Sequence, residues 1–138
     1  MVKGRVILLE SNIKVEMLNQ ILRGGDEESL LMGDIIRVLS LGFGRLWLSE
    51  LILELKGFRL SLNEKVELEE RKISKAVEKL EKMNIVKVES RLKSRLNASS
   101  MPDKLISLND YRRILENLKN DQRYNEYVKL RDEIFGKH

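Results

Sequence analysis

The sequence predicts a mainly α-helical protein with a small β-hairpin, an α+β fold with extra helices at both ends. Three observations support this class. Several segments carry apolar residues at the three- and four-residue spacing of amphipathic helices. Residues 85–91 and 104–110 alternate apolar and polar side chains, as half-buried strands do. One Pro and eight Gly in 138 residues argue against long disordered linkers.

The first helix is expected within "NIKVEMLNQILRGG". Its apolar residues have helical spacing, Ser11 or Asn12 can cap it, and the glycine pair at 24–25 can end it. Residues 5–10, before this helix, fit either a short strand or its first turn.

A second helix, a strand and a third helix follow. Asp26 is a good N-cap for the second helix, and Gly42 is placed to end it. The stretch "RLWL" predicts one short strand. Ser49 is then expected to cap the third helix, with Glu50 in the first turn and Gly57 at its end.

The next part of the chain predicts a fourth helix and a hairpin. Residues 58–66 form either a loop with a turn at Asn63 or an extra short strand. The fourth helix spans about 68–83, and Asn84 after it tolerates the left-handed conformation of a helix end. The two alternating strands then enclose a polar, basic loop at 92–103.

The composition excludes several kinds of active site. The chain has no Cys, and its single His is the last residue, His138, which removes thiol nucleophiles and most zinc and histidine chemistry. The phosphate-loop, HExxH and GxSxG motifs are absent. We therefore expect neither an enzyme nor a cofactor. The apolar runs are too short for a bilayer span or a signal peptide, which predicts a cytoplasmic protein without a membrane partner.

Positive charge is concentrated in one region. The whole chain has a net charge of +4, but residues 71–113 contain 12 Lys and Arg against 5 Asp and Glu, a net +7. The remaining residues contain 14 basic against 17 acidic side chains, a net −3. Such a distribution favours a polyanionic partner.

The fourth helix separates its side chains by type. At 100° per residue, one arc holds the apolar residues Ile73, Ala76, Val77, Leu80 and Met83. An adjacent arc holds Lys72, Lys75, Lys79 and Lys82, and the remaining side holds Glu67, Glu70, Glu78 and Glu81. Charged helix faces are usually only solvated, with pairs such as Glu78–Lys82 adding a few tenths of a kcal/mol. A continuous lysine stripe beside a basic hairpin favours a binding role instead.

Three stretches resemble parts of a winged helix-turn-helix domain. "IIRVLSLGFGRLWLSELILELKG" resembles its first helix, first strand and second helix. "RKISKAVEKLEKMNIVKVESR" resembles the recognition helix and first wing strand, and "PDKLISLNDYRRIL" resembles the second wing strand and the helix after it. The pattern is similar to the MarR/PadR-type transcriptional regulators of bacteria and archaea. It divides the chain into an N-terminal helical extension (1–25), a winged domain (26–110) and a C-terminal helix (111–138).

The resemblance implies a transcriptional regulator that binds double-stranded DNA. The recognition helix, about 68–83, would enter the major groove, and the wing, about 91–104, would follow the backbone or minor groove. The predicted DNA-binding residues are Arg71, Lys72, Lys75, Lys79, Lys82, Arg91, Lys93 and Arg95. The sequence does not reveal whether a small-molecule effector binds.

Two departures keep an alternative open. The connection at 58–66 is longer than the usual turn of about 3–4 residues. Glu67, Glu69 and Glu70 would stabilise the start of the recognition helix, but they would also repel phosphates. The alternative is a winged-helix adaptor that makes protein–protein contacts in the transcription or replication machinery.

A final helix is expected from Tyr111 to Phe135, with Asn109 or Asp110 as its cap and a polar interruption near 120–123. Its apolar stripe either packs on its own domain or pairs with a second subunit. In MarR/PadR-type proteins the terminal helices form the dimer, so the resemblance implies a homodimer with two recognition helices about one DNA turn apart.

Overall fold

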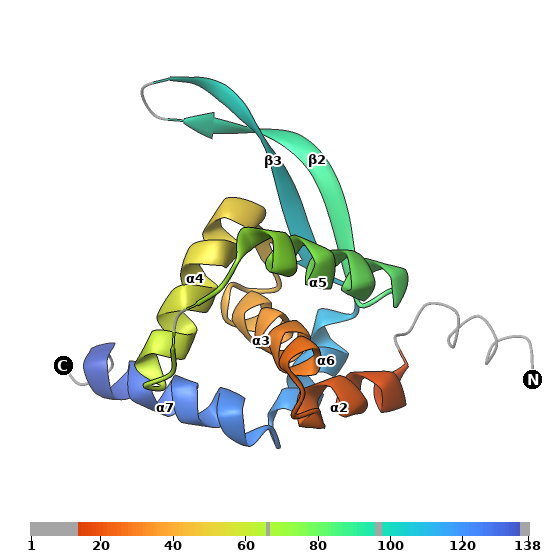
Figure 1. Ribbon diagram of the computed structural model, residues 1–138, viewed down its shortest axis with the longest axis vertical. Helices are drawn as coiled ribbons and strands as arrows, with labels where there is room; N and C mark the ends of the chain where they lie inside the picture. The colour runs from red at the N-terminus through yellow and green to blue at the C-terminus, as the bar shows by residue number, and fades with distance from the viewer. Residues whose placement is uncertain (1–13, 66, 96–97, 136–138) are drawn as a thin grey trace, which may run out of the picture.

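The computed structural model describes residues 14–65, 67–95 and 98–135, with backbone only at 93–95, 98–101 and 135. Six helices and a three-stranded antiparallel sheet make up the described chain, which confirms the mainly α, α+β class. In chain order the elements are α2 (Val15–Arg23), α3 (Glu27–Leu41), β1 (Arg45–Trp47), α4 (Leu48–Ser61), α5 (Glu70–Lys82), β2 (Val86–Arg95), β3 (Ala98–Leu108), α6 (Tyr111–Leu118) and α7 (Gln122–Phe135) (Figure 1).

α3 is the centre of the fold. Ten consecutive residues of this helix, from Leu31 to Ser40, are buried, since α2, α4, α5 and α6 all pack around it. Its N-cap is Asp26, as predicted, and the side chain accepts a 3.0 Å hydrogen bond from the backbone N–H of Ser29. Hydrogen bonds from the side chain and the backbone N–H of Ser29 lower the pKa of Asp26. The first helix, α2, joins the same core through Leu18 and Ile21; the predicted caps Ser11 and Asn12 lie outside the described residues.

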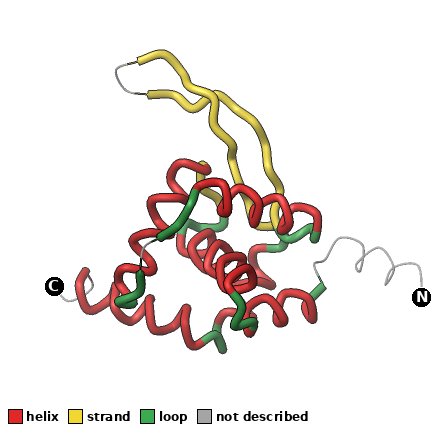
Figure 2. The backbone as a smooth tube through the Cα atoms, in the orientation of Figure 1, coloured by secondary structure: helices red, strands yellow, loops and turns green. Residues whose placement is uncertain are grey.

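The sheet has the strand order β1-β3-β2. β1 pairs with β3 only between Arg45↔Ser107 and Trp47↔Leu105. Beyond that point β2 and β3 continue as a two-stranded ribbon that projects past the body of helices (Figure 2). The predicted polar loop at 92–103 is therefore wrong, because the strands pair through most of it: Leu92 lies opposite Pro102, and the turn comes only after Arg95.

The two faces of the sheet differ in what covers them. Side chains alternate between faces along a strand. Val86 and Ile106 lie on the face that packs on the helices, and both are buried in the main core. We call this the inner face. Lys87, Glu89 and Arg91 lie on the other, outer face.

α4 differs from the prediction at both ends. It begins at Leu48, and the side chain of Glu50 accepts the backbone N–H of Trp47 at 3.2 Å. Ser49 is not the N-cap; its hydroxyl donates to Asp103 of β3 at 2.6 Å and so ties α4 to the ribbon. The helix also continues through Gly57, since the next residue, Phe58, is fully buried and anchors the last turn in the core.

The connection between α4 and α5 is correspondingly displaced. It spans 62–69 rather than 58–66, and the predicted turn at Asn63 is confirmed by a left-handed φ of 61°. Within its described residues the connection contains no strand. α5 begins at Glu70, about half a helical turn after the predicted start near 68. Asn84, which follows the helix, has a left-handed φ of 63°.

The predicted final helix is two helices. α6 ends at Leu118 and α7 begins at Gln122. The break has a physical reason at Asp121: one of its carboxylate oxygens accepts the backbone N–H of Tyr124 at 2.8 Å and the Nε of Arg37 at 2.7 Å. Asp121 thus caps α7 while it holds a buried arginine of α3. The polar interruption seen in the sequence marks this cap.

Candidate nucleic-acid interface

The buried stripe of α5 is as predicted. Ile73, Ala76, Val77 and Leu80 are all buried, and α5 packs against α3 with this side. The opposite side of the helix is therefore the one available to a partner. By helical spacing, Arg71 and Lys82 lie closest to the middle of that opposite side, and Lys75 and Glu78 lie on either side of them.

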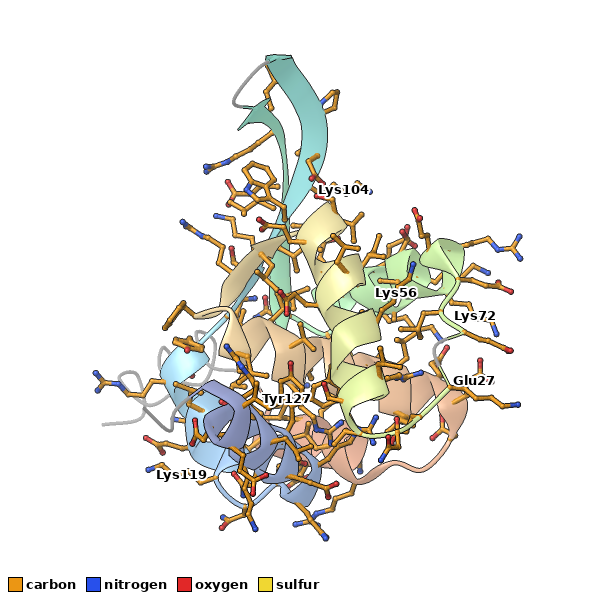
Figure 3. The ribbon with its side chains drawn as sticks, turned by 90° about the vertical axis from the view of Figure 1, so that its left-hand side faces the viewer. Glu27, Lys56, Lys72, Lys104, Lys119 and Tyr127 are labelled. Carbon is orange, nitrogen blue, oxygen red and sulfur yellow. The ribbon has the colours of Figure 1, made fainter. Side chains whose placement is uncertain are left out.

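The structure divides the five predicted cations of α5 into two groups. Lys72 and Lys79 lie toward the start of α3 and form ion pairs there, with Glu27 at 2.8 Å and with Glu28. The hydrogen bond between Lys72 and Glu27 raises the pKa of the lysine and lowers that of the carboxyl. Figure 3 shows Lys72 above Glu27. We call Lys72 and Lys79 the tethered lysines.

The other group points outward. Arg71 is 82% exposed, and its nearest carboxylate oxygen, of Glu69, is 3.9 Å away. Lys75 and Lys82 are exposed and form no ion pair with any described residue. Glu78 shares this face but leaves an excess of positive charge. We call Arg71, Lys75 and Lys82 the outward cations.

The acidic start predicted for the recognition helix is present in part. Glu69 is the N-cap and Glu70 the first residue of α5, whereas Glu67 lies in the connection before it. Both Glu69 and Glu70 are exposed. They favour the helix dipole, but they make the first turn unfavourable for a phosphate, so the attractive surface is the outward side from Arg71 onward.

Arg91, the predicted ribbon cation whose side chain the structure describes, is not on one surface with α5. Arg91 lies on the outer face and donates to Glu89 at 2.9 Å, which lowers the pKa of Glu89. Lys87, on the same face, has a looser contact with Glu89 at 3.9 Å. Arg91 is thus placed on the side of the sheet opposite the residues that pack on the helices. The side chains of Lys93 and Arg95 lie outside the described residues.

Lys104 is a cation that the sequence-derived set omitted. It is exposed on β3 opposite Ser90, on the inner face of the ribbon, and Figure 3 shows it above the start of α4. Its position in the alternating stretch "KLISL", two residues before the buried Ile106, was a signal that could have found it. Lys56 of α4 is a further half-buried cation on the side shown in Figure 3.

A second charged cluster lies inside the molecule. Asp34 is completely buried and accepts hydrogen bonds from three arginines: Arg37 at 2.8 Å, Arg59 at 2.9 Å, and Arg123 at 2.7 and 2.8 Å. Asp34, Arg37, Arg59, Glu64, Asp121 and Arg123 form the buried ion cluster. Its three arginines and three carboxylates balance in charge.

The cluster connects elements far apart in the sequence. Arg123 of α7 donates to both oxygens of Glu64 at 2.6 Å, so it joins α7 to the connection before α5. This bond lowers the pKa of Glu64. Burial alone would lower the pKa of Arg123, but its bonds to Glu64 and Asp34 outweigh burial and raise it. The sequence signal was Asp34 and Arg37, three residues apart inside an otherwise apolar helix.

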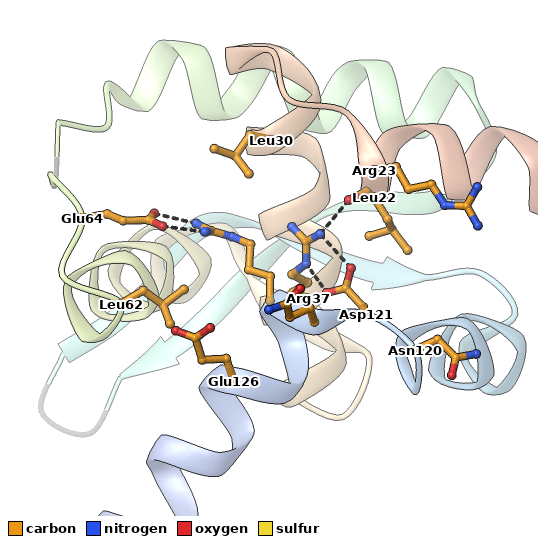
Figure 4. A pocket seen from close by; sticks show the side chains of 11 residues that line it. Leu22, Arg23, Leu30, Arg37, Leu62, Glu64, Asn120, Asp121 and Glu126 are labelled. Carbon is orange, nitrogen blue, oxygen red and sulfur yellow. Dashed lines mark hydrogen bonds and ion pairs between the residues drawn. The ribbon is translucent and has the colours of Figure 1, made fainter.

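A pocket of about 420 Å³ opens beside this cluster (Figure 4). Arg37, Asp121, Arg123 and Glu64 line it, together with Leu22 and other residues of α2 and α7. Four of the charged groups on its wall are already bound: Arg37 donates to Asp121 and to the backbone carbonyl of Leu22, and Arg123 donates to Glu64, as the dashed lines in Figure 4 show. A ligand here would have to compete with these bonds.

Other kinds of site find no support in the part of the chain that is described. There, no three His, Asp or Glu side chains gather in a way that could hold a metal ion. None of the described helices combines the length and apolar character needed to cross a membrane. No model of a known protein family matches the sequence, and no curated protein matches it either. The function must therefore be inferred from the geometry of the surface.

Proposed function

We propose that this protein is a winged-helix protein that binds double-stranded DNA and acts in transcriptional regulation. In this proposal α4 and α5 are the helix pair, α5 is the recognition helix, and the β2–β3 ribbon is the wing. The element order, the strand order β1-β3-β2 and the exposed far side of α5 support it. An α-helix fits the major groove of B-form DNA, and a two-stranded ribbon can reach the adjoining backbone.

One observation carries the proposal: Lys75 and Lys82 form no ion pair with a described residue, and Arg71 has only a loose contact with Glu69 at 3.9 Å. The tethered lysines are neutralised by α3, and the arginines of the buried ion cluster are neutralised by carboxylates. Arg71, Lys75 and Lys82 instead face solvent along one side of a single helix. Three cations on a helix face suit phosphates, which supply most of the affinity of proteins for DNA.

The test is fluorescence anisotropy of a labelled random-sequence duplex at two salt concentrations. We expect binding that weakens steeply with salt. The double variant K75A/K82A should lower the affinity at least about tenfold and reduce the salt slope by about one for each lost phosphate contact. The matched control is K119A/K129A, which removes two exposed lysines: Lys119, which Figure 3 shows at the end of the molecule away from the ribbon, and Lys129 of α7. Equal binding by both double variants would contradict the proposal.

A second candidate is a winged helix that contacts another protein. The supporting observation is on α4, where Leu53 and Leu60, two turns apart, are 69% and 64% exposed. If this candidate is right, L53S/L60S should abolish co-purification of a stoichiometric partner, and the duplex should not bind even at low salt.

The homodimer stays a prediction. The apolar side of α6 is buried in its own core through Ile114 and Leu118. The ring of Tyr127 of α7 packs against that of Phe58 in a tilted arrangement, with 4.7 Å between the ring centroids. A dimer would therefore need other surface, such as that around Ile134 near the end of α7, which is 63% exposed. Sedimentation equilibrium of the wild type and I134D would test it.

A further inference from the structure

An exposed apolar pair lies on the ribbon, beyond the core. Leu92 of β2 is directly opposite Pro102 of β3. Leu92 is 67% exposed, and Pro102 is exposed as well. A polar pair, Ser90 and Lys104, separates them from the buried Ile106, so they do not extend the core. Nothing in the described part of the molecule covers this pair.

The pair lies on the inner face of the ribbon. Along β2 the positions 86, 88, 90 and 92 share one face, and the strands stay in register as far as this pair because the register shift comes only between Lys93 and Arg95. The inner face is the one that packs on the helices, α5 among them, at the base of the ribbon. A duplex lying against the outward side of α5 would therefore meet Leu92, Pro102 and Lys104, whereas Arg91 lies on the far face.

The chemistry of the pair limits the kinds of partner that could bind it. Pro has no backbone N–H. Beyond its pairing with β1, β3 has an open side, and a Pro there disfavours the addition of another strand. A cation, Lys104, stands next to the pair on the same face and is exposed. A projecting ribbon with an exposed apolar pair and an adjacent cation matches proteins that insert Leu, Pro or similar side chains into the minor groove and anchor on its phosphates.

We propose that Leu92 and Pro102 form an apolar wedge that enters the minor groove of bound DNA, partly unstacks one base step and bends the duplex, with Lys104 on the adjacent phosphate. This inference rests on the proposed function, because it needs a duplex already held by α5. The energetic cost of unstacking is smallest at flexible pyrimidine–purine steps. The wedge therefore selects DNA by its deformability, at a place where the protein makes no hydrogen bonds to base edges.

The experiment measures DNA bending separately from binding. A duplex of about 30 base pairs, with a central TA step, carries a donor and an acceptor dye at its two ends. Energy transfer reports the bend, and anisotropy of the same duplex reports affinity. The variants are L92S and P102A, and the matched control is L60S, an equally exposed Leu at the far end of α4.

The wedge predicts that the wild type and L60S raise energy transfer, whereas L92S returns it to nearly the value of the free duplex. P102A should have a smaller effect in the same direction. L92S should weaken binding about tenfold or less, so bending can still be measured at saturating protein. If the wild type binds without bending the duplex, or if L92S bends it fully, the wedge is overturned while DNA binding stands. If the wild type does not bind the duplex at low salt, the proposed function fails, and the wedge with it.

Discussion

The buried ion cluster and the outward cations of α5 contain the same kinds of charged side chain but have opposite roles. In the cluster, three arginines meet three carboxylates at 2.6–3.0 Å, and Asp34 at the centre is fully buried. On α5, Arg71, Lys75 and Lys82 face solvent with one loose contact among them. Paired charges inside a protein fix the relative positions of its helices and strands, because an unpaired buried ion is energetically very unfavourable. Unmatched charge on a helix surface has little structural role and is available to a partner.

The tethered lysines stand between these two cases. They lie on the same helix as the outward cations, but Glu27 and Glu28 of α3 neutralise them at an exposed site. Two lysines of the stripe on α5 therefore form ion pairs within the domain, and the other two are exposed to solvent. This division can be tested by substitutions, from the largest expected effect to the smallest.

Asp34→Asn should be the most damaging change. It removes the buried negative charge that three arginines share, and loss of one partner from a buried ion pair destabilises by about 3–5 kcal/mol. Urea unfolding measures the free energy of unfolding. The control D132N changes an exposed carboxylate of α7 and should alter stability by less than about 0.5 kcal/mol. A D34N protein as stable as D132N would mean that the cluster does not hold the fold.

Gly33→Ala should cause the next largest loss of stability. An added Cβ would lie 2.9 Å from Nη1 of Arg37, which the cluster holds in place. Overpacking of this kind costs about 1–3 kcal/mol. Gly57→Ala is the matched control in α4, where an added Cβ meets nothing within 4 Å, and helix propensity predicts a gain of up to about 1 kcal/mol. Two changes of the same kind should therefore have opposite signs in thermal unfolding.

Glu64→Gln should remove a pH-dependent contribution to the free energy of unfolding. The pKa of Glu64 in the folded protein lies below its ordinary 4.5 because Arg123 hydrogen-bonds the carboxylate. The carboxylate therefore stabilises the fold above pH 4.5, and this contribution is lost as the pH falls through the lower, folded-state pKa. At neutral pH the variant should be less stable by about 1 kcal/mol, since the site is partly exposed. The difference should shrink in urea titrations at successively lower pH; a constant difference would contradict the pairing.

Glu27→Gln with Glu28→Gln should give the smallest change. Exposed ion pairs contribute between about 0 and 1 kcal/mol, so stability should hardly move. Released from α3, however, Lys72 and Lys79 would be free for phosphates, and we expect duplex affinity at low salt to rise by about threefold. Anisotropy measures it, and Glu116→Gln, an exposed carboxylate of α6, is the single-charge control. An unchanged or weaker affinity would mean that the tethered lysines are not near the DNA.

Much of the fold could be predicted, because the signals are local. The Asp26 cap, the left-handed Asn84 and the buried stripe of α5 each follow from neighbouring residues. The misplaced boundaries depend on contacts from distant elements. Ser49 was expected to cap α4, but its hydroxyl donates a hydrogen bond to Asp103, 54 residues later in the sequence. α4 runs past Gly57 because Phe58 enters the core.

Part of the geometry of the candidate site was predictable from the sequence. The sequence located the lysine stripe, but it could not show that Glu27 and Glu28 come close enough to claim Lys72 and Lys79, since those carboxylates are 45 and 51 residues away. The strand alternation of β2 held the information that Arg91 lies on the outer face. The length of the ribbon, however, depends on pairing through residues that look like a polar loop.

The most direct test compares the two lysine pairs of α5 with each other. K75A/K82A and K72A/K79A remove the same number of charges from one helix, so any difference between them arises from where the side chains point. Duplex affinity is measured by anisotropy at two salt concentrations. We predict that K75A/K82A loses at least about tenfold in affinity and about two units of salt slope, with a clearly smaller loss for K72A/K79A. Equal losses, or a larger loss for K72A/K79A, would contradict the assignment of the outward side of α5 as the DNA-binding surface.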